Sequence, residues 1–309
     1  MSDVTPEISV VIPVFNEVAT LADLHLRLAR TMKDLGRPWE VIFVDDGSTD
    51  GSTDVLRALH AQDPAVRVVR FNRNYGQHAA VFAGFERVRG DVVVTLDADL
   101  QNPPEEIPVL VRRLAEGVDV VGGARVNRHD PWFRRAASRA VNRATSAIIG
   151  VRMTDYGCML RAYRRPVIDQ IVACQEISRF IPALANTFAG SVAEVPVEHA
   201  PRREGRSKYG LLGLLRLNMD LMTGFSLLPI QAVSLSGIIV AALGLAFAVF
   251  LGIRRYVVGP EVEGVFTLFA ILFFFVGLQI LALGMIGEYV GRIYQEVRRR
   301  PRYVVSEIL

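Results

Sequence analysis

Two acidic residues, Asp97 and Asp99, are the residues of this sequence best suited to metal chemistry. They stand two positions apart at the end of an apolar run, in the segment V-V-V-T-L-D-A-D-L-Q. A hard cation such as Mg²⁺ or Mn²⁺ prefers oxygen ligands and, when held by one or two carboxylates, is completed by water and phosphate oxygens. The spacing therefore favours a Mg²⁺ or Mn²⁺ site with a nucleotide diphosphate as partner, although an acidic pair after a strand can also begin a turn.

The segments around this pair alternate between β-branched runs and helical patterns, which is typical of a parallel sheet with crossover helices. We predict strands over 8–14, 40–45, 66–71, 92–97 and 119–123, and helices over 20–35, 53–61, 77–88 and 104–115. Ligands of such sheets bind beyond the carboxyl ends of the strands. Polar clusters follow four strands, at 16–17, 45–46, 72–74 and 97–99. We expect these four segments to line one crevice.

The C-terminal third is apolar enough to enter a membrane. Hydrophobic residues make up 51% of the chain and the mean hydropathy is +0.29, which is high for a soluble enzyme. The stretches 221–253 and 264–287 contain no charged residue, whereas a spanning helix needs about 20 apolar residues. We predict a domain over 1–210, an interfacial helix over 211–226, a hairpin of two spans over 227–253 and 264–287, and a tail over 288–309.

Charge indicates the orientation of this hairpin. Residues 1–120 carry 12 Lys and Arg against 19 Asp and Glu, whereas residues 121–309 carry 23 against 13. Basic residues flank the predicted spans on their outer sides, and only Arg254 and Arg255 lie between them. The positive-inside rule therefore places the large domain and the tail in the cytoplasm. Residues 131–150 combine arginines four positions apart with an apolar stripe, which favours either an interfacial helix or an ordinary surface helix.

Several classes of protein are disfavoured by missing motifs. The chain has neither a G-x-G-x-x-G nor a G-x-x-x-x-G-K-[ST] sequence, which argues against a nicotinamide-type Rossmann enzyme and against a P-loop NTPase. Its arginines flank apolar segments, and no helix-turn-helix, zinc-finger or RNA-binding signature is present, so nucleic acid is not an expected partner.

Several motifs carry a resemblance to a known family. I-S-V-V-I-P-V-F-N-E, V-D-D-G-S-T-D, D-A-D-L-Q and the apolar hairpin resemble family 2 glycosyltransferases of the polyisoprenyl-phosphate type. More narrowly, four segments are similar to members that transfer 4-deoxy-4-formamido-L-arabinose: F-N-R-N-Y-G-Q-H-A-A (71–80), T-L-D-A-D-L-Q-N-P-P-E-E-I-P (95–108), T-D-Y-G-C-M-L-R-A-Y-R-R (154–165) and G-E-Y-V-G-R-I-Y (287–294).

The resemblance implies a GT-A type fold, which is a Rossmann-like, mostly parallel α/β sheet. It also implies inverting transfer of a sugar from a UDP-sugar to undecaprenyl phosphate, at the cytoplasmic face of a bacterial inner membrane. The implied pathway is modification of lipid A in lipopolysaccharide, with resistance to cationic peptide antibiotics, and the implied assembly is a homotetramer. UDP-glucose or another hexose donor is the alternative to the formamido-arabinose donor.

The resemblance also assigns roles to residues that match family positions. It implies that Gln101 joins Asp97 and Asp99 at the metal, while Asp45 either contacts the nucleotide or supports its loop. Arg125 is expected to stabilise the departing UDP. The remaining nucleotide contacts are expected at Pro13, Phe15, Glu17, Asp46, Asn74 and Gly76.

Cationic side chains are expected to bind the acceptor phosphate or the donor diphosphate. The implied residues are Arg135, Arg161, Arg206 and Lys208. For Arg135 and Arg206, contact with anionic lipid is an equal alternative. Asp155 occupies the position where relatives with hydroxyl acceptors keep a general base. A lipid phosphate has a second pKa of about 6 and arrives already anionic, so Asp155 either takes a proton or only orients the sugar or Arg161.

Two other functions share parts of this pattern. A processive polysaccharide synthase has a similar sheet and paired aspartates, but its Q-x-x-R-W signature is missing because the only tryptophans are Trp39 and Trp132. A non-catalytic membrane scaffold or flippase subunit would not need carboxylates at every expected position.

Overall fold

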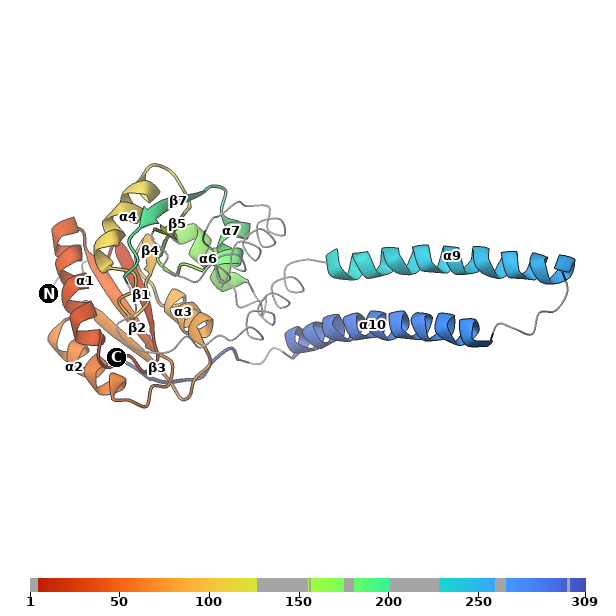
Figure 1. Ribbon diagram of the computed structural model, residues 1–309. Coiled ribbons are helices and arrows are strands. Elements are labelled where there is room, and N and C mark those ends of the chain that lie inside the picture. Colours follow the sequence, from red (N-terminus) through yellow and green to blue (C-terminus); the bar gives the residue numbers. More distant parts are fainter. Residues whose placement is uncertain are drawn as a thin grey trace. The chain divides into compact units, whose positions relative to one another are not determined.

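The computed structural model describes residues 5–126, 155, 157–174, 181–200, 228–258, 265–298 and 301–309. The chain forms two compact units (Figure 1). The first comprises residues 1–215 together with 301–309, and the second comprises residues 216–300. The predicted domain boundary at residue 210 lies close to the end of the first unit, but the return of the last nine residues to that unit was not predicted.

The first unit is built on one sheet. Among the described residues it contains eight strands in the order β7-β5-β6-β4-β1-β2-β3-β8, in which β6 and β8 run antiparallel to their neighbours. The strands are β1 (Ile8–Val14), β2 (Trp39–Asp45), β3 (Val66–Phe71), β4 (Val92–Thr95), β5 (Val120–Arg125), β6 (Arg161–Arg164), β7 (Val192–Val197) and β8 (Val305–Ile308). The helices are α1 (Leu21–Leu35), α2 (Ser52–Gln62), α3 (Gln77–Phe85), α4 (Ile107–Ala115), α6 (Arg165–Ala173) and α7 (Ile181–Phe188), with a 3₁₀ turn, η1, over Pro104–Glu106.

The mostly parallel sheet that the sequence predicted is confirmed. Each of the five predicted strands and four predicted helices has a counterpart within a few residues of its expected bounds. The largest differences are three residues: α3 ends at Phe85, and α4 begins at Ile107 because residues 104–106 form the 3₁₀ turn η1. Strand β4 ends two residues early, at Thr95, and β5 ends two residues late, at Arg125. Strands β6, β7 and β8 were not predicted.

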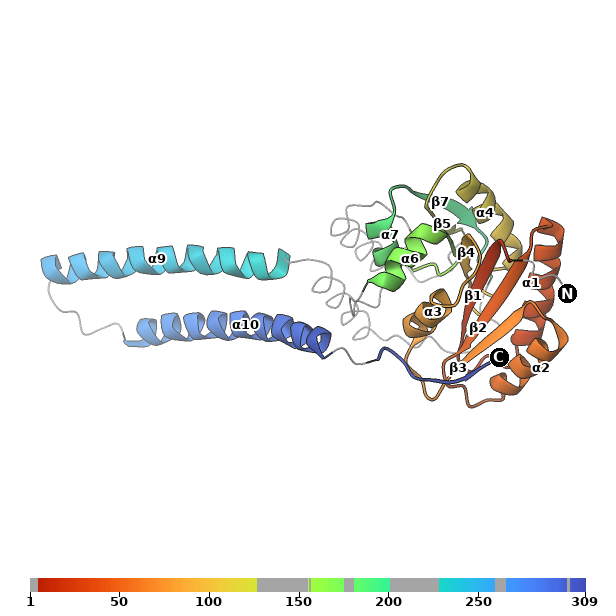
Figure 2. The ribbon, with the colours of Figure 1, turned by 180° about the vertical axis from the view of Figure 1, so that it is seen from behind.

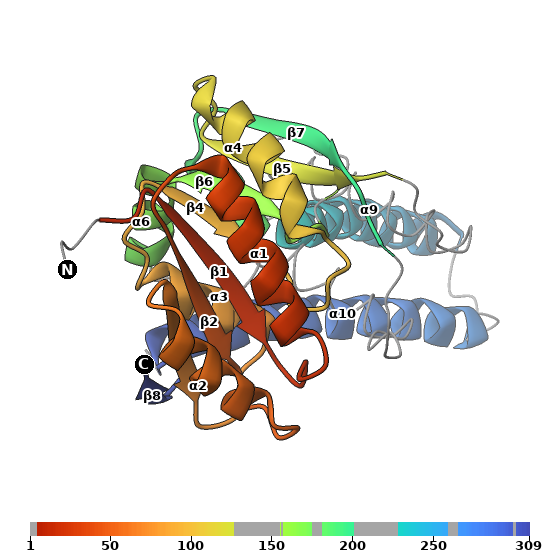
Figure 3. The same cartoon turned by 90° about the vertical axis from the view of Figure 1, so that its left-hand side faces the viewer.

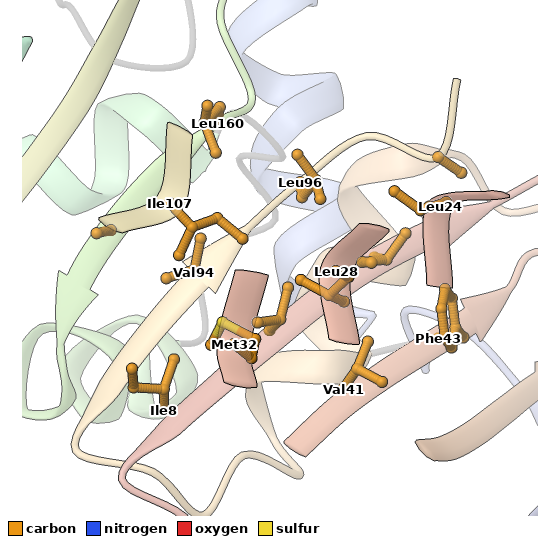
Figure 4. Close-up of a cluster of buried hydrophobic side chains, with 14 of the residues drawn as sticks. Ile8, Leu24, Leu28, Met32, Val41, Phe43, Val94, Leu96, Ile107 and Leu160 are labelled. Atoms are coloured by element: carbon orange, nitrogen blue, oxygen red, sulfur yellow. The ribbon is translucent and has the colours of Figure 1, made fainter. Parts of the chain in front are cut away.

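Helices cover both faces of the sheet (Figure 3). Helices α1, α2 and α4 lie on one face, and α3 and α6 lie on the other. Helix α1 buries Leu21, Leu24 and Leu28, which repeat at helical spacing, against alternate residues of the strands such as Ile8 and Phe43. Figure 4 shows this cluster between α1 and the strands. Because both faces are covered, consecutive residues of β1 and β2 are apolar, as expected for buried parallel strands.

The second unit consists, among the described residues, of two long helices, α9 (Leu228–Val258) and α10 (Val265–Val297). Each helix begins within one residue of a segment predicted as a span and continues past the predicted C-terminal end, to Val258 and Val297 respectively. Within the described residues one stretch, Phe274–Gly291, is long and apolar enough to cross a membrane. A shorter apolar stretch lies at 230–244 in α9. Large apolar side chains such as Leu243, Leu272 and Leu283 are exposed on the two helices.

The predicted tail over 288–309 differs from the structure. Its first ten residues continue α10 to Val297, and residues 305–308 form β8 at the edge of the sheet beside β3. Figure 2 shows this strand along β3, near the C-terminus. Four residues carry too short a pattern for a sequence-based strand prediction, and the partner strand is more than 230 residues away in the chain.

A buried carboxylate, Glu40, holds together the amino ends of the central strands. It accepts hydrogen bonds from the Ser9 hydroxyl (2.7 Å), from the Arg89 backbone N–H (2.8 Å) and from the Arg67 and Arg89 guanidinium groups (3.0 and 2.9 Å). Burial alone would raise the pKa of this carboxyl, but the hydrogen bonds from Ser9, Arg89 and Arg67 together hold the pKa below its ordinary value. Ionised Glu40 therefore stabilises the sheet at the end opposite to the polar clusters.

We expect Glu40→Gln to lower the apparent Tm of the full chain by several degrees at pH 7, because removing a buried, paired charge costs about 2–4 kcal/mol. A lowered native pKa stabilises the fold above the pKa of this carboxyl in the unfolded chain, which is about 4.3, and this contribution is lost as the pH falls through the native pKa. The Tm difference should thus shrink below about pH 4. The measurement is intrinsic fluorescence during heating.

Glu7→Gln, which breaks the exposed pair with Arg37, is the matched control and should shift Tm little. Equal shifts for both variants would contradict this role.

Candidate active site

Loops that follow β1 and β2 are tied together by hydrogen bonds. The Asn16 N–H donates to the Ser48 hydroxyl (3.0 Å), and the Thr49 N–H donates to the Asn16 side-chain oxygen (2.9 Å). The Glu17 N–H donates to the Ser52 hydroxyl (3.0 Å). These bonds hold Glu17 beyond the end of β1. Pro13 in β1 and Phe15 just after it are half-buried, as is Glu17.

The acidic pair at the end of β2 supports the neighbouring loops. Asp45 is fully buried and accepts hydrogen bonds from the Ser48 N–H (2.8 Å) and the Thr53 hydroxyl (2.6 Å), an arrangement that favours the structural interpretation of this residue. Asp46 accepts hydrogen bonds from the N–H groups of Tyr75 (2.6 Å) and Gly76 (2.8 Å). Its carboxylate thus fixes the loop over 72–76, which leads from β3 into α3 and contains the exposed Asn74.

Gly47 lies where the β2 loop and the 72–76 loop approach each other most closely. Its φ is +73°, and a Cβ at this position would lie 2.5 Å from the carbonyl carbon of Arg73. Only glycine fits both the conformation and the space. The glycine of the V-D-D-G-S-T-D motif is therefore required for packing, a role that the sequence analysis did not assign.

Asp97 and Asp99 lie beyond the end of β4, and each is held by hydrogen bonds. Gln77, the first residue of α3, donates from its side-chain amide to the Asp97 carboxylate (2.6 Å). The backbone N–H of Gln101 donates to the Asp99 carboxylate (3.1 Å). The Thr20 hydroxyl donates to the carbonyl of Ala98 (2.8 Å), which ties this turn to the loop after β1. The turn therefore meets both α3 and the β1 loop.

The electrostatics of this turn are dominated by burial and by the closeness of two carboxyl groups. Burial and the charge of Asp99 raise the pKa of the Asp97 carboxyl to about 7, and Glu17 contributes in the same direction. Arg125 and the hydrogen bond from Gln77 act against this rise. Among the described residues no cluster of three or more Asp, Glu, His or Cys side chains is placed to bind a metal. A cation with phosphate oxygens as further ligands fits this donor set, because it would offset the repulsion between the two carboxylates.

Arg125 and Asp155 form a two-point ion pair at the end of β5. The Arg125 guanidinium donates through Nε (2.6 Å) and a terminal nitrogen (2.8 Å) to the two carboxylate oxygens of Asp155. The Gly157 N–H also donates to Asp155 (3.2 Å), and the Asp155 N–H donates to Glu194 (3.1 Å). Asp155 is buried, whereas the Arg125 side chain is about one-fifth exposed. The pair therefore fixes the orientation of the Arg125 guanidinium, whose positive charge acts on Asp97.

Arg161, the first residue of β6, contacts the backbone of Asp155 from within the protein interior. Its side chain is fully buried, and its guanidinium donates to the backbone carbonyls of Cys158 (2.9 Å) and Asp155 (3.1 Å). This geometry favours a structural role over the phosphate contact that the resemblance implied. The other three expected phosphate contacts, Arg135, Arg206 and Lys208, lie outside the described residues, as do the predicted interfacial helices over 131–150 and 211–226.

The structure thus brings five strand ends to one edge of the sheet, with two carboxylates and an oriented guanidinium among them. Sequence reasoning did not single out Gln77, Thr20 or Glu194. Gln77 lies in the quoted segment 71–80, but nothing local in the sequence indicates that its side chain reaches Asp97.

An α/β sheet with this acidic turn is the GT-A type arrangement of a glycosyltransferase, and the chain belongs to glycosyl transferase family 2, whose model matches residues 9–172. Its relatives include the undecaprenyl-phosphate 4-deoxy-4-formamido-L-arabinose transferase of Edwardsiella ictaluri (strain 93-146), 52% identical over 98% of this chain and 94% of the relative. The protein of the same name from Aeromonas hydrophila is also 52% identical, with the same coverage.

Solved structures support the fold. Glucosyl-3-phosphoglycerate synthase from Mycobacterium tuberculosis, in complex with phosphoglyceric acid, aligns with a TM-score of 0.53 at 22% identity, covering 71% of this chain and 80% of that one. The same enzyme with Mn²⁺, UDP and phosphoglyceric acid aligns with a TM-score of 0.52 at 21% identity, covering 71% and 77%. At this identity the likeness confirms the GT-A type fold.

Proposed function

We propose that this chain transfers a sugar, 4-deoxy-4-formamido-L-arabinose, from its UDP donor to undecaprenyl phosphate, and so provides a lipid-linked sugar for lipid A modification. The identity of about one half over nearly the whole chain to transferases named for this reaction carries the proposal. The aligned region includes the apolar helices as well as the sheet, so the similarity covers the parts of the chain that would meet a lipid acceptor.

The acidic turn supports a donor that carries a diphosphate. Asp97 and Asp99, with Gln101, would hold Mg²⁺ or Mn²⁺, and when bound the metal supplies Lewis-acid stabilisation of the departing UDP. Arg125 is already oriented by Asp155, so its charge acts on developing negative charge without reorganisation. Pro13, Phe15, Glu17, Asp46, Asn74 and Gly76 stand on the loops around this turn and are the proposed contacts of the uridine and its ribose.

The acceptor supports a single displacement with inversion. Undecaprenyl phosphate is anionic at neutral pH and can attack the anomeric carbon without losing a proton, because the second pKa of a phosphate monoester is about 6. Both oxygens of Asp155 already accept hydrogen bonds from Arg125. This pairing supports an orienting role for Asp155 rather than a role as general base.

A bacterial inner membrane is the proposed location. The apolar surface of α9 and α10 would lie in the bilayer as two spans, and the arginines on their outer flanks would keep the first unit and the C-terminus in the cytoplasm. A homo-oligomer, a tetramer by resemblance, is part of the same proposal.

The experiment that tests this proposal is a donor panel. The purified full chain in detergent is incubated with undecaprenyl phosphate, Mn²⁺ and each of several UDP-sugars, and the lipid product is identified by mass. The formamido-arabinose product is expected. A product only with UDP-glucose or another hexose would replace the sugar assignment, and polymer of increasing length would indicate a processive synthase. No lipid product with any donor would contradict the acceptor assignment and favour a non-catalytic role.

We expect Asp155→Asn to retain more activity than a variant of the metal-binding pair. The amide oxygen of Asn can still accept one hydrogen bond from Arg125, so the loss in kcat should be about 10- to 100-fold. The measurement is kcat across pH 6–9, at saturating donor and acceptor. If Asp155 were a general base, the loss would be larger and the pH profile of the remaining activity would change shape.

A further inference from the structure

The C-terminal segment, residues 301–309, reaches the loop over 72–76. Strand β8 pairs antiparallel with β3, and Val68 and Leu309 exchange two backbone hydrogen bonds (3.0 and 2.9 Å). The contact continues past the end of β3, because the Asn72 N–H donates to the carbonyl of Val304 (3.2 Å). The first residue of the loop is therefore held by the backbone of this segment.

An aromatic contact connects the same segment to the middle of the loop. The Tyr303 ring stacks on Phe71, the last residue of β3, with a centroid distance of 4.7 Å and an interplanar angle of 16°. Phe71 is 1% exposed and meets the Tyr75 ring edge-on at 5.7 Å. The Tyr75 N–H in turn donates to Asp46. A continuous series of contacts therefore runs from Tyr303 to the carboxylate that fixes the loop.

The segment also contacts helix α3, which follows the loop. The Arg302 guanidinium lies 3.9 Å from the centre of the Phe82 ring and donates to the carbonyl of Cys174 (2.8 Å). The Tyr303 hydroxyl forms a hydrogen bond with Glu86 at the end of α3. Helix α3 begins with Gln77, the donor to Asp97. Residues 302–304 thus pack against both elements that flank the 72–76 loop.

We propose that Tyr303 is a positioning residue for nucleotide binding. Stacked on Phe71, it keeps the 72–76 loop in the conformation in which Asp46 binds the loop's N–H groups. The inference rests on the proposed function, since that is where this loop is assigned to the nucleotide. It extends the nucleotide site to the last residues of the chain, which lie more than 200 residues from the loop in sequence.

The test is direct binding of UDP, with Mn²⁺, to the full chain in detergent by calorimetry. Tyr303→Ala removes the stacked ring and should weaken UDP binding about 3- to 10-fold, the effect expected from an aromatic pair. The KM for the donor should rise by a similar factor, while the KM for undecaprenyl phosphate and kcat should change less than about twofold. Tyr303→Leu, which keeps apolar volume, serves if the alanine variant does not fold, and a smaller loss is expected for it.

Two control variants separate positioning from general attachment of the segment. Tyr303→Phe keeps the ring and should bind UDP as the unmodified chain does. Glu307 lies on the same segment as Tyr303 and pairs with Arg57 of α2 (2.7 Å). Glu307→Gln breaks this pair and should also leave UDP binding unchanged.

Unchanged UDP binding in Tyr303→Ala with a lowered Tm, or equal losses in Tyr303→Phe or Glu307→Gln, would overturn the inference. Because UDP binding is measured without acceptor, it stays readable if the chain binds UDP but transfers nothing to undecaprenyl phosphate. That outcome would contradict only the proposed function.

Discussion

Asp99→Asn is expected to lower sugar transfer about 10³-fold or more while leaving the fold intact. The substitution removes one of the two charges that would hold the divalent cation, and stabilisation of a leaving diphosphate by a metal amounts to several kcal/mol. The side chain is half-buried, and its hydrogen bond from the Gln101 N–H can be kept by an amide oxygen. The measurement is release of UDP in the presence of undecaprenyl phosphate, with the Tm as the test of folding.

A matched control for this variant is Asp54→Asn, the same change at an exposed ion pair with Arg57 in α2. It should transfer sugar at the normal rate. Raising the Mn²⁺ concentration should recover part of the activity of Asp99→Asn if its defect is weakened metal binding. Full activity of Asp99→Asn at low Mn²⁺ would remove Asp99 from the metal site.

Arg125→Ala is expected to lower kcat about 10²- to 10³-fold with a smaller effect on the KM of the donor. Its guanidinium would act on charge that develops only as the sugar leaves UDP, so its removal costs transition-state stabilisation more than ground-state binding. The variant also leaves the buried Asp155 carboxylate without its two-point partner. The measurement is steady-state kinetics with a varied donor, together with UDP affinity.

Two further variants test the geometry of this pair. Arg125→Lys keeps the positive charge but cannot donate to both oxygens of Asp155 at once, so it should recover only part of the activity. Arg113→Lys, at an exposed pair with Glu116, is the matched control and should be fully active. If Arg125→Lys were as active as the unmodified chain, the orientation provided by Asp155 would have no catalytic role.

Local patterns predicted much of the sheet and the placement of its polar residues. Strands β1 to β5 are rich in β-branched and other apolar residues, and Asp45, Asp46, Asp97 and Asp99 stand at or just after the ends of β2 and β4, where turns must follow. These features depend on hydrophobic periodicity and turn chemistry, which are properties of neighbouring residues. Strand β6 was missed because its four residues, R-A-Y-R, look like an exposed segment. Arg161 is nonetheless buried there, because backbone carbonyls accept its hydrogen bonds.

The sequence by itself determined that a parallel sheet carries acidic turns at its strand ends and that long apolar helices follow it. Only the tertiary structure decided which side chains meet: Arg125 with Asp155, Gln77 with Asp97, and Tyr303 with Phe71. The physical reason is that such pairs are selected by complementary shape and by the need to satisfy buried polar groups. Both conditions exist only after segments that are 20 to more than 200 residues apart have packed together.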